Sequence, residues 1–121
     1  MRKYFSQKLH KEMAKNDDLF LLTGDLGYGF WDRIRLDYSD RFYNFGSSEQ
    51  LMVGAAVGMA MEGKIPIVYS ITPFLLYRPF ELIRKPFKNL QVLHPKDDTE
   101  LDNLFESFIT NRQPSYINLI R

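Results

Sequence analysis

The sequence predicts an α/β fold in which a mostly parallel β-sheet is covered by helices on both faces. Short apolar runs of strand length alternate with longer segments of helical periodicity, and this alternation is typical of parallel sheets. The run LFLLT over residues 19–23 has the apolar character of a strand that is buried on both sides. A length of 121 residues suits one core, so we expect a single domain over residues 1–121.

The first half of the chain opens with a helical pattern. Phe5, Leu9 and Met13 recur every four residues, which is the spacing that lines one helix face, and we expect this helix to end near Asn16. Strand and helix patterns then alternate: the strand over 19–23, a short helix over 31–36 and a second strand over 42–45.

A long, glycine-rich helix is expected next. Ser47 and Ser48 are good N-cap residues before it, and Gly63 stands where a helix stop is expected. Gly54 and Gly58 lie four residues apart, so one face is nearly bare backbone. Each glycine costs about 1 kcal/mol of helix propensity relative to alanine. We therefore expect close packing against this face as compensation.

The remaining chain predicts three more strands alternating with two helices. The strands are expected over 65–70, 90–93 and 115–119, and the helices over 79–84 and 99–109. Thr99 is the expected N-cap of the last helix.

Composition excludes several classes of protein. Sixteen Lys and Arg against fifteen Asp and Glu leave a net charge of +1, which provides no broad attraction for nucleic acid. With no cysteine and two histidines, we expect no metal site within the chain. No apolar stretch reaches the roughly 20 residues of a membrane span and no signal sequence is found, so we expect a cytoplasmic protein without membrane partners.

Glu49 is the strongest candidate for a functional residue. It begins a glycine-rich helix directly after a predicted strand, where parallel sheets place their ligands. Position alone also allows a simpler role, since an acidic side chain is favoured by the dipole at any helix N-terminus. The glycines at 24, 27 and 29 do not form a G-x-G-x-x-G motif, so nicotinamide-cofactor binding is not supported.

The sequence around Glu49 resembles a known family. The string GSSEQLMVGAAVGMA over 46–60 is similar to the G-x-x-E-Q-x-x-x-G-x-A-x-G-x-A signature of thiamine-diphosphate enzymes of the transketolase family, in their pyrimidine-binding domain. Four further segments resemble the same domain: TGDL at 23–26, IPIVYS at 65–70, RPFELIR at 78–84 and LHPKD at 93–97. Family members carry several tens of residues, including another strand, after the I-R helix. Here Arg84 is followed almost at once by the strand pattern at Leu90, so either the chain is shortened after Arg84 or the sequence given omits a segment. A true shortening would remove a strand and part of the active-site rim.

The resemblance implies a role for each candidate site residue. In the family, the residue matching Glu49 is catalytic, because it hydrogen-bonds N1′ of the cofactor's aminopyrimidine and activates it. Burial beside an apolar ring is expected to raise the pKa of its carboxyl group. Asp25 and Leu26 match cofactor-binding positions, and Phe74, or else Tyr77, matches the aromatic residue that stacks on the pyrimidine. Core packing for Phe74, a surface position for Tyr77 and loop capping for Asp25 are the alternatives.

The resemblance also implies a partner. The chain has no G-D-G motif for the diphosphate, since Gly24 and Asp25 are followed by Leu26. It therefore resembles the C-terminal subunit of a split transketolase, which needs a separately encoded diphosphate-binding subunit. Thiamine diphosphate is the implied cofactor, Mg²⁺ is bound mainly by the partner, and a homo- or hetero-oligomer is expected.

The implied activity is the transfer of a two-carbon ketol unit between sugars or sugar phosphates. The related alternatives are the β subunit of a 2-oxoacid dehydrogenase and a deoxyxylulose-phosphate-synthase-like enzyme, which share the glutamate motif. A non-catalytic pyrimidine-domain interaction module is the alternative from a different class. A generic nucleotide-binding α/β domain leaves the Glu49 helix unexplained.

Overall fold

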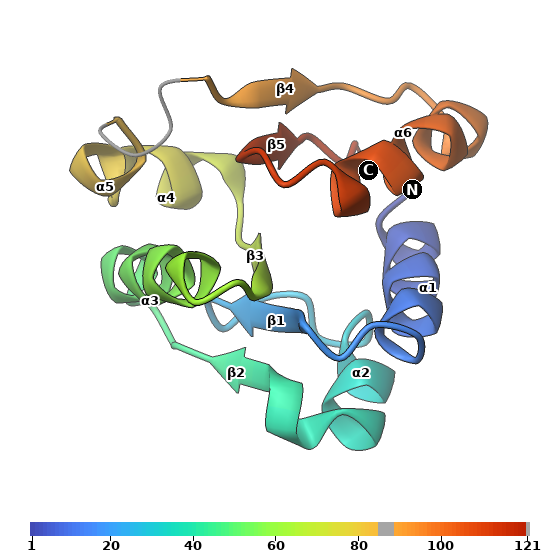
Figure 1. Ribbon diagram of the computed structural model, residues 1–121, viewed down its shortest axis with the longest axis horizontal. Coiled ribbons are helices and arrows are strands. Elements are labelled where there is room, and N and C mark those ends of the chain that lie inside the picture. Colours follow the sequence, from blue (N-terminus) through green and yellow to red (C-terminus); the bar gives the residue numbers. More distant parts are fainter. Residues whose placement is uncertain (85–88, 121) are drawn as a thin grey trace.

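The computed structural model describes residues 1–84 and 89–120 and alternates helices with strands along the chain (Figure 1). The strands are β1 (Leu19–Thr23), β2 (Phe42–Asn44), β3 (Ile65–Tyr69), β4 (Gln91–Leu93) and β5 (Ser115–Ile117). The helices are α1 (Arg2–Met13), α2 (Asp32–Asp37), the 3₁₀ helix η1 (Ser39–Arg41), α3 (Glu49–Met61), α4 (Thr72–Tyr77), α5 (Phe80–Arg84) and α6 (Asp98–Thr110).

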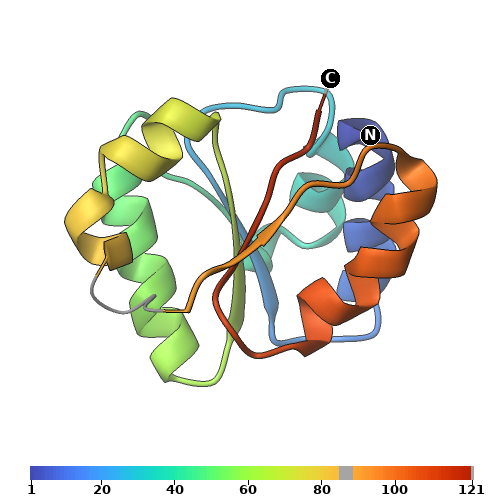
Figure 2. The same cartoon turned by 90° about the horizontal axis from the view of Figure 1, so that it is seen from above.

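Every strand pair is parallel, which confirms the predicted fold class. The strands form two sheets, a three-stranded one in the order β2-β1-β3 and a two-stranded one of β4 and β5. Helices α3, α4 and α5 lie on one side of the strands, and α1, α2 and α6 lie on the other (Figure 2). The division into two sheets differs from the continuous sheet expected from the sequence, because β3 and β5 do not pair with each other.

Two apolar clusters attach the helices to the larger sheet. On one side, Leu9 of α1 and Leu101 of α6 are fully buried against Leu21 of β1. On the other side, Met52 of α3 is fully buried against Leu22. Burial of such a side chain contributes about 1.5–3 kcal/mol. Successive residues of β1 therefore pack into the two clusters in turn, which explains why this strand is apolar on both faces.

The structure corrects two expectations about the helices. Helix α4 was not predicted, because six residues are too few to display a helical period, although Pro73 in its first turn is a helix start signal. A Cβ atom on Gly58 would meet nothing within 4 Å, and one on Gly54 would meet only Leu82 Cδ1, at 3.6 Å. The close packing expected at these glycines is therefore not provided by the described part of the chain.

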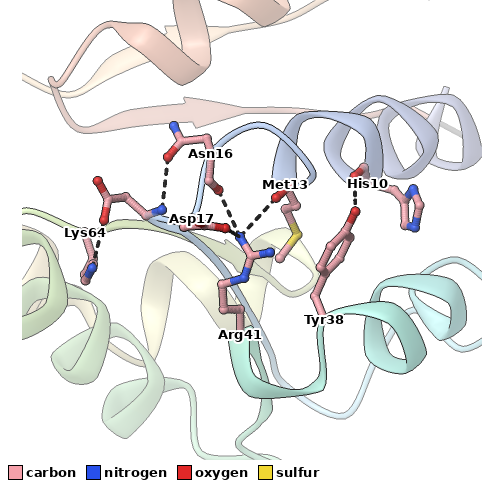
Figure 3. A network of polar contacts seen from close by, with 8 residues as sticks. His10, Met13, Asn16, Asp17, Tyr38, Arg41 and Lys64 are labelled. Atoms are coloured by element: carbon pink, nitrogen blue, oxygen red, sulfur yellow. Dashed lines mark hydrogen bonds and ion pairs between the residues drawn. The ribbon is translucent and has the colours of Figure 1, made fainter.

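A polar network fixes the turn between α1 and β1 (Figure 3). Arg41 donates hydrogen bonds to the carbonyl oxygens of Met13 and Asn16 at 3.1 and 2.9 Å. The Tyr38 hydroxyl donates to the carbonyl oxygen of His10 at 3.3 Å. The carbonyl groups of His10 and Met13 lie in the last turn of α1, where they lack partners within the helix, so these bonds satisfy them. The bond to Asn16 ties Arg41 to the turn that follows α1.

The N-cap of α6 is Asp97 and not Thr99 as predicted. The Asp97 carboxylate accepts a hydrogen bond from the backbone N–H of Glu100 at 2.8 Å. Asp97→Ala is expected to lower the free energy of unfolding by about 1 kcal/mol, because this N–H loses its partner. Urea denaturation measures the change, and Thr99→Ala is the matched control. A loss from Thr99→Ala as large as that from Asp97→Ala contradicts the assignment.

No helix in the described ranges is both long enough and apolar enough to cross a membrane.

Candidate active site

Glu49 is the first residue of α3, and its side chain is buried at the end of the larger sheet, with 1% of the residue exposed. Arg78 donates from Nη1 to Oε2 of Glu49 at 2.7 Å, and the Ser70 hydroxyl donates to Oε1 at 3.3 Å. An ionised carboxylate buried this completely requires charged and hydrogen-bonding partners. Arg78, which is half exposed, supplies the charge from the solvent side.

The parallel sheet determines where Glu49 lies. Gly24 follows β1, Gly46 lies just beyond β2 and Ser70 follows β3, so the carboxyl ends of three strands meet at this site. Open α/β sheets bind ligands at this edge. A Cβ atom on Gly24 would stand 3.3 Å from Oε1 of Glu49 and 3.4 Å from the carbonyl oxygen of Gly46. A larger residue at position 24 would therefore push against the carboxylate.

Two opposing influences set the pKa of Glu49. Burial raises the pKa, as expected from the sequence. The hydrogen bond and the charge of Arg78, together with bonds from the Glu49 backbone and Ser70, outweigh burial and hold the pKa below its usual value. Glu49 is therefore ionised at neutral pH while Arg78 holds it.

Phe74 and Tyr77 both lie on α4 but occupy different surroundings. Arg78 Cζ stands 3.8 Å from the centroid of the Phe74 ring, which places this half-buried ring beside the Glu49–Arg78 pair. The Tyr77 side chain is directed to solvent, with 78% of the residue exposed. Of the two aromatic candidates, the structure thus brings Phe74 into contact with Arg78, the partner of Glu49.

Asp25 shapes the loop that leaves β1. Its φ of 57° is the left-handed conformation that asparagine and aspartate tolerate best among residues with a side chain. Its carboxylate accepts hydrogen bonds from the Tyr28 hydroxyl and from Asn44 Nδ2, and the first of these contributes most to lowering the pKa of Asp25. Leu26 follows as a partly buried residue. Loop capping accounts for these contacts of Asp25.

The same loop rests on Trp31. A Cβ atom on Gly27, which has a φ of 84°, would overlap the indole, at 2.2 Å from Trp31 Nε1. The Trp31 ring is 3% exposed and meets the edge of Tyr69, with centroids 4.9 Å apart. Only glycine fits at position 27, and the loop is packed directly on the indole.

Three residues of the site were not predicted as functional. Arg78 and Ser70 contact Glu49, and Asn44 Oδ1 accepts hydrogen bonds from the backbone N–H groups of Asp25 and Gly46 at 2.9 and 3.0 Å. Arg78 and Ser70 lie in segments that resemble the family, so the resemblance could have pointed to them as site residues.

Comparison with known families matches residues 1–85 to the family described as transketolase, pyrimidine binding domain. The chain belongs to this family. The matched range of this pyrimidine-binding domain contains Glu49, Ser70 and Arg78, and it ends directly after α5.

Curated relatives of the pyrimidine-binding domain include several transketolase-like proteins. A putative transketolase C-terminal section of Methanocaldococcus jannaschii is 35% identical over 85 residues, which cover 69% of this chain and 27% of the relative. A 1-deoxy-D-xylulose-5-phosphate synthase of Dehalococcoides mccartyi is 37% identical over 81 residues, which cover 65% of this chain and 12% of the enzyme. The chain thus spans about a quarter or less of the lengths of these relatives.

A solved structure shares the fold of this pyrimidine-binding domain. It is described as a split gene transketolase, inactive beta4 tetramer, and it superimposes with a TM-score of 0.83 over 96% of this chain and 49% of that one. At 22% sequence identity, the likeness concerns the fold. Within residues 1–84 and 89–120 of the chain, no group of three Asp, Glu, His or Cys side chains is placed to hold a metal ion.

Gly24→Ala in the pyrimidine-binding domain is expected to lower the free energy of unfolding by about 1–3 kcal/mol, because the added methyl group displaces the Glu49 carboxylate. Thermal unfolding measures the loss. Gly58→Ala is the matched control, since its new methyl group enters open space. Equal effects of the two substitutions contradict the tight approach at Gly24.

Proposed function

We propose that this chain is the pyrimidine-binding subunit of a transketolase-like transferase that uses thiamine diphosphate, with Glu49 as its catalytic residue. The observation that carries the proposal is the buried Glu49 carboxylate at the carboxyl ends of three parallel strands. It stands at the position of the glutamate in the family motif over 46–60.

The residues around Glu49 fit an aminopyrimidine ring. Gly24 has no Cβ atom that would press on Oε1, and the Phe74 ring packs on Arg78, the partner of the carboxylate. An offset-stacked or edge-on aromatic contact contributes about 0.5–1.5 kcal/mol beyond area burial. We assign Phe74 this stacking role, with Tyr77 of the same helix as the second aromatic candidate. Asp25 and Leu26 would contact the ring from the loop after β1.

Thiamine diphosphate, when bound, supplies the carbon nucleophile of this chemistry. The task of this chain is to hold and move a proton at Glu49. Arg78 keeps the carboxylate ionised, and because burial is the largest single influence, the pKa of Glu49 rises when Arg78 gives up its contact. A carboxyl group with a raised pKa can exchange a proton near neutral pH, as general acid–base catalysis requires.

The diphosphate end of the cofactor and Mg²⁺ are assigned to a separately encoded partner subunit. Helix α3 supports this assignment, because its apolar residues Leu51 and Met61 are 64% and 82% exposed. Gly58 lies on the same helix with open space around it. Exposed apolar surface of this kind marks interaction sites. The functional unit is thus a homo- or hetero-oligomer.

The reaction we propose is the transfer of a two-carbon ketol unit between sugars or sugar phosphates in the cytoplasm. The similarity to 1-deoxy-D-xylulose-5-phosphate synthases favours a synthase-like condensation as the second candidate. Analysis of products from the assembled enzyme separates the two reactions, and also separates them from the 2-oxoacid dehydrogenase reaction.

Calorimetric titration of thiamine diphosphate and Mg²⁺, with and without a candidate diphosphate-binding subunit, tests the proposal. We expect binding that requires the partner and is lost in Glu49→Ala. Tight partner binding with no cofactor binding identifies instead a non-catalytic interaction module and overturns the proposal.

Gly58→Ala is expected to stabilise the isolated chain by about 1 kcal/mol, because alanine is the better helix former and nothing obstructs its methyl group. The same substitution is expected to weaken partner binding if α3 is the interface. Thermal unfolding measures the stability of the isolated chain, and calorimetry of the complex measures its affinity for the partner. Unchanged partner affinity places the interface away from Gly58.

A further inference from the structure

Arg78 contacts both of the side chains that are assigned above to the pyrimidine ring. Its Nη1 donates to Oε2 of Glu49 at 2.7 Å, and its Cζ lies over the ring of Phe74, 3.8 Å from the centroid. A group this close to the centroid must lie over the ring face, because the ring's own atoms keep an in-plane neighbour farther away. One guanidinium therefore bonds to the carboxylate and covers a face of Phe74 at the same time.

The fold encloses the Oε1 side of the Glu49 carboxylate. The Ser70 hydroxyl donates to Oε1 at 3.3 Å, and a Cβ atom on Gly24 would stand 3.3 Å from the same oxygen. The Oε2 side is different, because the contact there is Arg78, whose side chain is 45% exposed while that of Glu49 is 1% exposed. Arg78 thus lies between the carboxylate and solvent, and a ligand that approaches Oε2 from solvent meets the guanidinium first.

A guanidinium and an aminopyrimidine share their recognition chemistry. A guanidinium is flat, its N–H donors lie in its plane and match a carboxylate, and it stacks on aromatic faces. An aminopyrimidine is also flat, carries nitrogen atoms in its plane that form hydrogen bonds with a carboxyl group, and stacks on aromatic rings. A ring that pairs with Glu49 and stacks on the covered face of Phe74 needs both of the places that Arg78 fills.

Arg78 can leave these places without rearrangement of the backbone. It lies between α4 and α5, which lie on the same side of the strands as α3 (Figures 1 and 2). Pro79, directly after it, is fully buried and anchors the chain at this point. The Arg78 side chain is long and already half exposed, so turning its charged end outward removes little buried surface.

We propose that Arg78 is the resident occupant of the aminopyrimidine position. Its guanidinium pairs with Glu49 and covers Phe74 in the free chain, and it turns to solvent when the ring binds. The inference rests on the function proposed above, because the ring is that of thiamine diphosphate. It makes Arg78 a determinant of affinity, since apparent affinity falls with the fraction of molecules in which a site is open. An arginine that fills the position about nine-tenths of the time weakens ring binding about tenfold.

The test titrates the full chain with the aminopyrimidine fragment of thiamine, which lacks the thiazolium and the diphosphate, at millimolar concentrations. Binding is followed by chemical shifts in nuclear magnetic resonance spectra. We expect Arg78→Ala to bind the fragment about tenfold more tightly than the unmodified chain, because the competing side chain is gone. Adding Phe74→Leu to this variant is expected to abolish the gain.

Arg84→Ala is the matched control for Arg78→Ala. Arg84 is the next arginine along the chain, and it forms an exposed pair with Glu81 at 3.0 Å. This variant is expected to bind the fragment as the unmodified chain does. Circular dichroism checks that each variant is folded. Arg78→Lys is included because it keeps a positive charge beside Glu49 while its ammonium group has no flat face, and it is also expected to bind the fragment more tightly than the unmodified chain.

A second measurement uses the unmodified chain alone. The side-chain protons of Arg78 lie over the Phe74 ring, so its ring current shifts their resonances. Saturation with the fragment is expected to move these resonances to the values of an exposed arginine, while those of Arg84 stay constant.

Three results would overturn the inference. The first is equal affinity of the unmodified chain and the folded Arg78 variants. The second is saturation of the unmodified chain without a change at Arg78, and the third is no binding to any variant. None of these decides the proposed function, which depends on the titration of thiamine diphosphate with the partner subunit. Failure of that titration, together with tighter fragment binding by Arg78→Ala, would reject the proposed function and keep the role of Arg78 at the ring position.

Discussion

Glu49→Gln is expected to reduce turnover of the assembled, cofactor-loaded enzyme by about 100- to 10,000-fold, the usual contribution of a positioned acid–base group. Glutamine keeps the size of the side chain and can accept a hydrogen bond from Arg78, but it cannot take up and release a proton. Steady-state kinetics with saturating thiamine diphosphate and Mg²⁺ provide the measurement.

The control for this substitution is Glu106→Gln, which makes the same chemical change at an exposed position of α6. Its turnover is expected to equal that of the unmodified enzyme. Turnover of Glu49→Gln within threefold of the unmodified enzyme, with cofactor bound, would remove Glu49 from the chemistry. Loss of cofactor binding without loss of turnover per bound cofactor would assign Glu49 a binding role alone.

Arg78→Met is expected to destabilise the chain at neutral pH and to reverse the pH dependence of its stability. Removing the cation leaves Glu49 buried without its charged partner, which costs about 3–5 kcal/mol for a fully buried pair. We expect about 2 kcal/mol, since Arg78 is half exposed and its charge is partly screened by solvent.

The sign of the pH dependence follows from the pKa of Glu49. In the unmodified chain this pKa lies below the unfolded value, so its contribution is present above about pH 4 and is lost as the pH falls further. In Arg78→Met, we expect burial to outweigh the remaining bonds from the Glu49 backbone and Ser70 and to raise the pKa of Glu49 above the unfolded value, so stability is expected to increase as the pH falls from neutral. Urea denaturation at several pH values measures both slopes.

Arg33→Met is the control for this experiment, because Arg33 is 80% exposed in a surface pair with Asp37. It is expected to change stability by less than about 1 kcal/mol. Because Arg33 helps to lower the pKa of Asp37, any change in slope is expected only at acidic pH, below the range in which the slopes are compared. If Arg78→Met is as stable as the unmodified chain at pH 7, the Glu49–Arg78 ion pair does not contribute to the free energy of unfolding.

Elements with a strong local signal could be predicted from the sequence. Helix α1 shows Phe5, Leu9 and Met13 at helical spacing, and all three are buried in the structure. The strand β1 and its neighbours followed from their apolar runs. Helix α4 could not be predicted from its period, and the N-cap of α6 was placed two residues late because Asp97 and Thr99 are both good caps.

The candidate site could be predicted only in part. Glu49 was located by its motif and its place after a strand. The predicted rise of the Glu49 pKa was wrong. The shift depends on Arg78, a residue 29 positions away that reaches the carboxylate only in the folded chain. The division into two sheets also could not be predicted from local patterns. Whether β3 and β5 pair depends on how strands far apart in the sequence are placed in the fold.

Trp31 makes the loop after β1 observable. It is the single tryptophan of the chain, its ring is buried under Gly27 and against Tyr69, and it alone dominates emission excited at long ultraviolet wavelengths. Any ligand that shifts Asp25 or Leu26 moves the backbone that covers the indole. The protein therefore carries an intrinsic fluorescent reporter beside its candidate site, and binding can be followed in solution without a label.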